Sequence, residues 1–219
     1  MLAIFDFMLA VLSPQIAQAQ GTLYVSNLGQ TCTGSSPVGN DSWLAADFVT
    51  GTNAGGYLLN SVQLALTNAS GTPSGFTAMI YSYNPLLYGA AVLPGSSLGT
   101  LNGSLDPVAG GIYTYSPAST LTLSPGTVYF IVLTAGTGVA SGAYEWSVTS
   151  TQTPTLSGGW HGDDTFLSSS GGLNWGPVAN AFPQFAIYAT PAVPEPSTLG
   201  LFVLGGFLLV WRHRKAKAI

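Results

Sequence analysis

Charged residues are scarce in this sequence, and basic residues are the scarcest of all. Only 5% of its 219 residues are Asp, Glu, Lys or Arg, against about 25% in an average soluble domain. All four Lys and Arg residues follow Trp211. Proteins that bind nucleic acid use Lys and Arg to neutralise phosphates. Because the body contains neither Lys nor Arg, we exclude nucleic acid as its partner.

The sequence also lacks the glycine period of three that is typical of collagen, although it contains 28 Gly and 14 Pro. Aromatic residues make up 11% of the chain, which is too many for a disordered polar segment. Residues 20–193 carry six acidic side chains and no basic one. These features predict one folded, acidic body with targeting signals at its ends.

Cysteine occurs only once, at Cys32, so no disulfide can form within the chain. The body holds one histidine, His161, and no spacing connects it with Cys32. The sequence has no G-x-S-x-G elbow either. We therefore expect a protein that is not an enzyme and has no cofactor. A secreted hydrolase that combines His161 and Asp163 with one of the many serines stays the least favoured alternative.

Short β-type runs separated by Gly, Pro, Asn and Ser fill the body. They alternate apolar and polar residues, as strands with one buried face do. The run at 128–134 is apolar on both faces, which predicts a central strand. The expected strands are 23–28, 43–50, 58–66, 76–82, 98–101, 112–115, 119–123, 128–134, 144–149 and 184–189.

This strand spacing predicts an all-β fold, since no segment of the body keeps a helical period. We expect an antiparallel β-sandwich or jelly-roll-like ectodomain over residues 20–190. An N-terminal signal segment and a short C-terminal transmembrane helix would flank it. A domain of this length buries a substantial core without disulfides.

The N-terminus resembles a secretory signal peptide over residues 1–19. An apolar run is followed by Ala17-Gln18-Ala19, an A-x-A pattern that predicts cleavage after Ala19. Asp6 stands where a basic residue is expected, so the true start is expected upstream of Met1. The alternative is a buried first helix or strand. A signal peptide implies export through the Sec translocon.

The C-terminal segment, residues 191–219, combines a proline pair, an apolar run and a basic end. The apolar run at 199–211 has 13 residues, fewer than the roughly 20 of a stable membrane span. The basic tail predicts a cytoplasmic end and a stop to translocation. It consists of Arg212, Arg214, Lys215 and Lys217. We expect a helix that holds the chain in the membrane only transiently.

The motif at 193–199 and the segments after it resemble the PEP-CTERM sorting signal of bacterial surface proteins. Its residues are Val193, Pro194, Glu195, Pro196, Ser197 and Thr198, followed by Leu199. The resemblance implies processing near Pro194-Glu195-Pro196 by an exosortase, a membrane cysteine enzyme similar to transpeptidases. It also implies a Gram-negative bacterium that makes exopolysaccharide. Two prolines hold such a segment extended. The alternative is a permanent single-pass anchor with a proline-rich stalk.

The body resembles the choice-of-anchor domains, most nearly those of type R. The similar segments are Trp43-Leu-Ala-Ala-Asp-Phe-Val-Thr-Gly51, Leu59-Asn-Ser-Val-Gln-Leu64, Leu123-Ser-Pro-Gly-Thr-Val-Tyr-Phe130 and Gly142-Ala-Tyr-Glu-Trp146. This resemblance implies a surface module of an exported protein. It implies no catalytic residue and no binding site.

One loop is a candidate ligand site, formed by Trp160, His161, Asp163 and Asp164. Its two carboxylates are a minimal start for calcium, which takes six to eight oxygen ligands. Trp160 and Trp175 are candidates for stacking on sugar rings. A polar turn and core tryptophans are the favoured alternatives, so we assign no metal site.

Together these features predict a non-enzymatic, exported bacterial surface or extracellular-matrix protein. An exosortase would sort it through its tail, and it would be associated with exopolysaccharide or a biofilm. The protein would stay in the inner membrane transiently and then reach the cell surface or matrix of a Gram-negative bacterium. The alternative is a carbohydrate-binding surface module, with extracellular polysaccharide as its partner.

Overall fold

The computed structural model describes residues 21–84, 92–150, 154–162 and 164–193. Every regular element within these residues is a β-strand, and all strand pairs are antiparallel. This confirms the all-β prediction for the body. No helix in the described residues has the length and apolar character needed to span a membrane. The expected signal segment at 1–19 and the apolar helix at 199–211 lie outside these residues.

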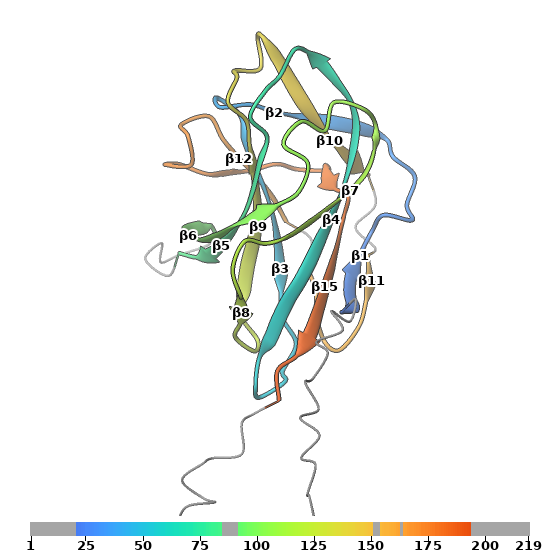
Figure 1. Cartoon of the computed structure of the whole chain (residues 1–219), viewed down its shortest axis with the longest axis vertical. Helices are drawn as coiled ribbons and strands as arrows, with labels where there is room; N and C mark the ends of the chain where they lie inside the picture. The colour runs from blue at the N-terminus through green and yellow to red at the C-terminus, as the bar shows by residue number, and fades with distance from the viewer. Residues whose placement is uncertain (1–20, 85–91, 151–153, 163, 194–219) are drawn as a thin grey trace, which may run out of the picture.

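The strands follow one another along the chain without an intervening helix in the described part (Figure 1). Their bounds are β1 Thr22–Ser26, β2 Gly34–Val38, β3 Trp43–Val49, β4 Tyr57–Gly71, β5 Thr77–Tyr83, β6 Pro94–Asn102, β7 Gly111–Pro117, β8 Thr122–Leu123, β9 Val128–Thr134, β10 Gly142–Thr149, β11 Thr155–Leu156, β12 Thr165–Ser168, β13 Gly176–Pro177, β14 Phe182–Pro183 and β15 Phe185–Pro191.

Two runs of neighbouring strands build the sheet. One run has the order β11-β1-β15-β4-β7, and the other has the order β6-β5-β9-β3-β12-β13. A short pairing of β7 with β6 connects them. Strand β10 lies beside the second half of β4 and carries β2 and β14. The expected sandwich or jelly-roll type stays a prediction.

The buried positions of the long strand β4 shift from odd to even numbers halfway along, although both halves face the main core. Tyr57 and Leu59 are buried in its first part, and Val62 and Leu64 are buried in its second part. Since buried residues in a strand alternate, a shift from odd to even positions requires one extra residue. That residue is Asn60, because β15 pairs first with Leu59 and then with Ser61.

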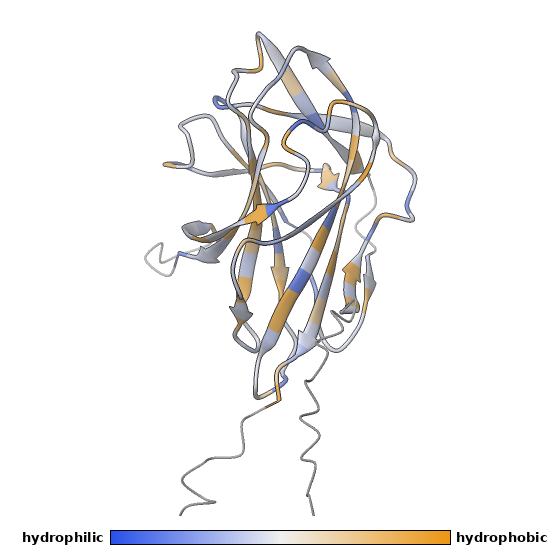
Figure 2. Ribbon diagram, in the orientation of Figure 1, coloured by the Kyte–Doolittle hydropathy of each residue, from blue (hydrophilic) through white to orange (hydrophobic). Residues whose placement is uncertain are grey.

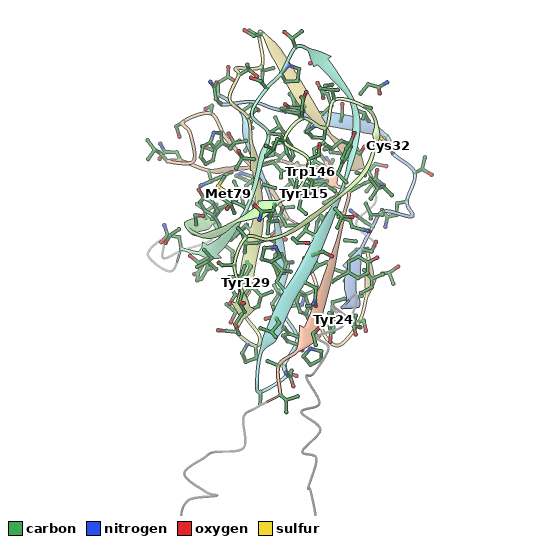
Figure 3. The ribbon with its side chains drawn as sticks, in the orientation of Figure 1. Tyr24, Cys32, Met79, Tyr115, Tyr129 and Trp146 are labelled. Atoms are coloured by element: carbon green, nitrogen blue, oxygen red, sulfur yellow. The ribbon has the colours of Figure 1, made fainter. Side chains whose placement is uncertain are left out.

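The main core receives inward side chains from both runs of strands. Apolar residues alternate with polar ones along several of these strands (Figure 2). Trp146 of β10 is fully buried, and its indole Nε1 donates a hydrogen bond to the Gln184 carbonyl over 3.1 Å. Figure 3 shows Trp146 and Tyr115 in the interior of the body. The buried indole is therefore both packed and hydrogen-bonded.

Strand β9 lies between β5 and β3, which confirms the predicted central position. Its alternate residues face two different clusters. Ile131 and Leu133 belong to the main core, whereas Phe130 and Val132 belong to a second cluster on the outer face. The strand is apolar on both faces because both faces are covered.

The expected strands differ from the observed ones at several places. The segment expected at 119–123 forms only the two-residue β8, and the strand expected at 98–101 is the longer β6. Strand β2 was not expected, since its sequence Gly-Ser-Ser-Pro-Val has little apolar character. Pairing with β10 stabilises it instead. The short β11, β13 and β14 likewise form by pairing with neighbours.

Candidate functional site

The body begins and ends at the same end of the molecule. Thr22 in β1 pairs with Ala189 in β15, so the first and last strands lie side by side (Figure 1). Asn27 reinforces this pairing, because its Oδ1 accepts the Phe185 N–H and its Nδ2 donates to the Pro183 carbonyl. The segments before β1 and after β15 therefore leave the body close together.

A short turn holds the backbone where the chain leaves β15. The Ala192 N–H donates to the Gly56 carbonyl over 2.9 Å. The side-chain Nδ2 of Asn53 donates to the Ala192 carbonyl over 3.0 Å and to the Gly56 carbonyl over 2.6 Å. Both backbone polar groups of Ala192 are thus occupied. We call Asn53, Gly56 and Ala192 the exit clamp.

Aromatic side chains form a packed layer at this end of the body. Trp160 is only 1% exposed and stacks between Tyr24 and Phe48, with ring centroids 4.7 and 5.9 Å away. The edge of Tyr57 meets the same indole at 4.9 Å. Burial raises the pKa of the Tyr24 hydroxyl, and Tyr57 beside it raises that pKa further. Trp160 is therefore a core residue and presents no surface to a sugar.

The backbone around the clamp fits closely, and this depends on glycine. Gly56 has a φ of +74°, and a Cβ there would lie 2.4 Å from the Leu123 carbonyl oxygen. A Cβ on Gly51 would clash with the Gly158 carbonyl oxygen. Only glycine allows such approaches without distortion. The turn that carries Asn53 is thus tightly packed against its neighbours.

The predicted sorting residues lie directly after this end. Val193 is described and is 82% exposed. The other motif residues, Pro194, Glu195, Pro196, Ser197 and Thr198, lie outside the described residues. So do the basic tail of Arg212, Arg214, Lys215 and Lys217, and the predicted signal cleavage site at Ala17 and Ala19. The structure therefore shows where the sorting segment starts.

The loop expected to bind a ligand is described except for Asp163. His161 pairs through its backbone with Val49, and its side chain is exposed. The backbone N–H of Asp164 donates to Asp47 Oδ1 over 2.8 Å. Asp163 lies outside the described residues. Among the residues described, no three His, Cys, Asp or Glu side chains are grouped to hold a metal ion.

A small pocket lies beside this loop. Asn27, Asp47, Asp164, Thr165 and Phe182 contribute to its wall. Its cavity volume is about 20 Å³, enough for a water molecule and far below the several hundred Å³ of a typical small-molecule site. Asp47 could not be predicted from the sequence as part of this wall, because its partner Asp164 is 117 positions away.

A second group of aromatic residues covers the outer face of β5, β9, β3 and β12. Trp43, Tyr81 and Trp175 are half-buried there and pack on a cluster that includes Phe130 and Phe166. Gly172 fits between the two tryptophans, since a Cβ would lie 3.0 Å from Trp43 and 3.8 Å from Trp175. Sequence reasoning named Trp175 but missed the others. The alternation of Trp43 with the inward-facing Leu44 is the signal that could have found that residue.

Cys32 lies at the periphery of the body, just before β2 (Figure 3). Its thiol is exposed and lies 3.1 Å from the Gly34 carbonyl oxygen. His161, the histidine of the body, follows Trp160 near the end of β3. The structure therefore places the two reactive side chains on different elements.

Residues 192–215 match the PEP-CTERM protein-sorting motif. The match begins directly after Pro191, the last residue of β15. The motif indicates an exported extracellular protein that is sorted at the membrane and processed by an exosortase. No curated protein and no solved structure matches the chain. The resemblance of the body to choice-of-anchor domains stays a prediction.

Proposed function

We propose that this chain is a non-enzymatic surface or extracellular-matrix protein of a Gram-negative bacterium. Its body, a β-sandwich in this proposal, is displayed outside the cell after an exosortase has processed the tail. The observation that carries the proposal is the position of the sorting motif. The match starts at residue 192, directly after Pro191 ends the last strand. The whole described body thus precedes the processing segment.

The charge distribution supports this order of events. The body carries acidic side chains and no basic one, whereas all basic residues lie after Trp211. Basic residues stay on the cytoplasmic side, and acidic ones have little effect on translocation. The Sec translocon therefore exports the body, and the short apolar run at 199–211 holds the tail in the membrane until processing.

The residue inventory of the body supports a role without catalysis. Residues 20–193 contain one His, one Cys and one Glu. General acid–base and nucleophilic catalysis need such groups within hydrogen-bond reach of one another. His161 and Cys32 lie on different elements. We therefore assign the body to packing, display and adhesion.

We also propose that the mature protein is associated with exopolysaccharide, and the charge of the body limits which kind of polymer fits. A body with no Lys or Arg has no cation with which to pair the carboxylates or sulfates of an anionic polymer. A neutral polysaccharide needs no such pairing. We therefore propose that the matrix component beside the mature protein is a neutral glycan.

The second candidate function is carbohydrate binding by the outer face of the sheet. Trp160 is too deeply buried to contact a glycan. Trp43, Tyr81 and Trp175 remain partly exposed over a buried apolar floor. Rings held in this way present apolar faces at a low cost in conformational entropy. This arrangement favours stacking on neutral sugar rings, without a contribution from calcium.

The deciding experiment is mass spectrometry of both ends of the mature protein from its native host, combined with cell fractionation. We expect a mature chain that begins at Gln20, ends near Pro194-Glu195-Pro196 and is found at the surface or in the matrix. A chain that still ends at Ile219 and stays in the inner membrane would identify the tail as a permanent anchor.

A further inference from the structure

The exit clamp and the sorting motif share a residue. Ala192 is the first residue of the matched motif, and its N–H and carbonyl both bind the turn at Asn53 and Gly56. Only Val193 lies between Ala192 and Pro194. The segment that an exosortase must take up is therefore tied to the folded body at its first position.

The clamp depends on the side-chain amide of Asn53. Its two N–H groups account for the bonds to the Gly56 and Ala192 carbonyls. The Asn53 carbonyl accepts the Gly56 N–H over 2.8 Å, and the Asn53 N–H lies 3.3 Å from the Tyr57 hydroxyl. Three interactions thus hold Asn53 in place before Ala192 binds. The remaining bond of the clamp joins the Ala192 N–H to Gly56.

Enzymes that cleave or transfer peptide chains bind the backbone on both sides of the reacting bond, in an extended form. A reacting bond near Pro194-Glu195-Pro196 has Val193 and Ala192 on its body side. The backbone of Ala192 cannot bind the enzyme while it binds Asn53 and Gly56. The clamp must therefore open before the enzyme groove takes up this residue.

We propose that the exit clamp slows exosortase processing and that the side chain of Asn53 determines the free energy needed to open the clamp. The observed processing rate is then the rate from the open state multiplied by the fraction of chains that are open. After processing, the clamp closes again on Ala192 and secures the new C-terminal end of β15. Asn53 is a positioning residue in this scheme. The inference rests on the proposed exosortase processing.

The test measures processing of the full-length protein in its native host by pulse-chase labelling. Asn53→Ala removes both amide bonds, of which only the bond to the Ala192 carbonyl joins the turn to the exit segment. We expect about fivefold faster processing, since loss of one hydrogen bond of ordinary strength changes an equilibrium by about this factor. Asn53→Asp is also expected to be faster, because a carboxylate repels the two carbonyl oxygens. The matched control is Asn68→Ala, which removes the side-chain Oδ1 that accepts a hydrogen bond from the Gly110 N–H, away from the clamp.

A second variant distinguishes the effect of the clamp on processing from a general loss of stability. Insertion of Gly-Ser-Gly-Ser between Val193 and Pro194 supplies free backbone on the body side of the reacting bond. It should raise the rate without a change in the clamp, and Asn53→Ala should then add nothing. Amide hydrogen exchange of the mature proteins should show faster exchange at Ala192 in Asn53→Ala, with Ile187 unchanged.

Three results would overturn the proposal. One is an unchanged processing rate in Asn53→Ala although Ala192 exchanges faster. Another is an insertion variant that is processed at the wild-type rate. The third is a wild-type chain that keeps Ile219 in the host, which would refute the proposed function itself and leave the clamp a purely structural role. The first two results would leave exosortase processing intact, so the two failures can be told apart.

Discussion

The indole of Trp160 stacks on the phenol ring of Tyr24 with 4.7 Å between ring centroids and 18° between ring planes. Tyr24 belongs to β1, and Trp160 follows β11 after a turn in which Trp160 N–H binds the Ser157 carbonyl. Phe48 of β3 stacks on the other side. The ring stack therefore joins both runs of strands at the end where the sorting segment leaves.

Trp160→Ala should be among the most destabilising substitutions in the body. It removes a fully buried ring and its stacking partners, which costs about 3–5 kcal/mol. Trp160→Phe should cost less than half as much, because the indole Nε1 has no hydrogen-bond partner among the described residues to lose. Urea unfolding of the mature protein measures both. A loss below about 1 kcal/mol in Trp160→Ala would contradict this packing role.

The prediction from sequence succeeded where local pattern decides the outcome. Val128–Thr134 is apolar on both faces and is central, because no other position buries both faces. Pattern alone was less informative for Trp160. It favoured a core position over a sugar contact but could not identify the residues that pack on the indole. Its stacking partners Tyr24 and Phe48 are far from it in sequence.

The clamp could not be predicted for the same reason. The segment Asn53-Ala-Gly-Gly56 forms a turn in which the Gly56 N–H donates to the Asn53 carbonyl. However, the partner of Asn53 is 139 positions away. Strand β2 was missed because its pairing with β10, and not its own composition, stabilises it. A single sequence does not show which distant residues will pair with one another.

Alkaline pH should destabilise the body through its buried tyrosines. Burial, the hydrogen bond to Asp106 and the charge of that carboxylate raise the pKa of Tyr144 to about 12 from 10.0. The folded protein therefore binds this proton more tightly than the unfolded chain. The stabilisation is complete below pH 10 and is lost as the pH rises from 10 to about 12. It amounts to up to about 3 kcal/mol.

Urea unfolding at several pH values between 8 and 12 measures this loss. Residues 20–193 contain no Lys or Arg, so no amine or guanidinium side chain of the body contributes to this pH dependence. Tyr144→Phe should reduce the pH dependence without abolishing it, because burial also raises the pKa of Tyr24, Tyr81 and Tyr115. Tyr113→Phe, which removes a hydroxyl from an exposed hydrogen bond, is the matched control. Equal slopes in wild type and Tyr144→Phe would refute the assignment.

His161→Ala should leave both folding and the biological role intact. The side chain is exposed, and only the backbone of His161 pairs with Val49. The free energy of unfolding should change by less than about 0.5 kcal/mol. The fraction of mature protein retained in the matrix should equal that of the wild type. A hydrolase activity of the wild type that this variant loses would favour the enzyme alternative.

Substitutions on the outer face should reveal whether it binds glycan. Trp175→Ala and Trp43→Ala should each weaken retention of the mature protein on insoluble exopolysaccharide from the host by about threefold or more, since each removes one ring. Leu173→Ala is the matched control, because this side chain is 83% exposed in the same loop but carries no ring. If the wild type and all three variants are retained equally, the aromatic residues of the outer face serve packing only.

Sorting should fail when the motif is removed and the anchor is kept. Replacing Pro194, Glu195 and Pro196 with Ala removes the recognition element but leaves the apolar run at 199–211 and the basic tail. The chain should therefore accumulate uncleaved in the inner membrane, with its body outside the cytoplasm. Pro191→Ala is the matched control, because it changes a proline just before the matched residues 192–215.

Removal of the basic tail should have a different effect from removal of the motif. Without Arg212, Arg214, Lys215 and Lys217, little stops translocation of a 13-residue apolar run, so part of the chain should pass through unprocessed. Immunoblots of inner-membrane, periplasmic and external fractions distinguish these fates, and mass spectrometry identifies each C-terminus.

The same measurements test the motif variant. Normal cleavage after replacement of Pro194, Glu195 and Pro196 would show that recognition lies elsewhere in the tail, since the anchor and the body are unchanged.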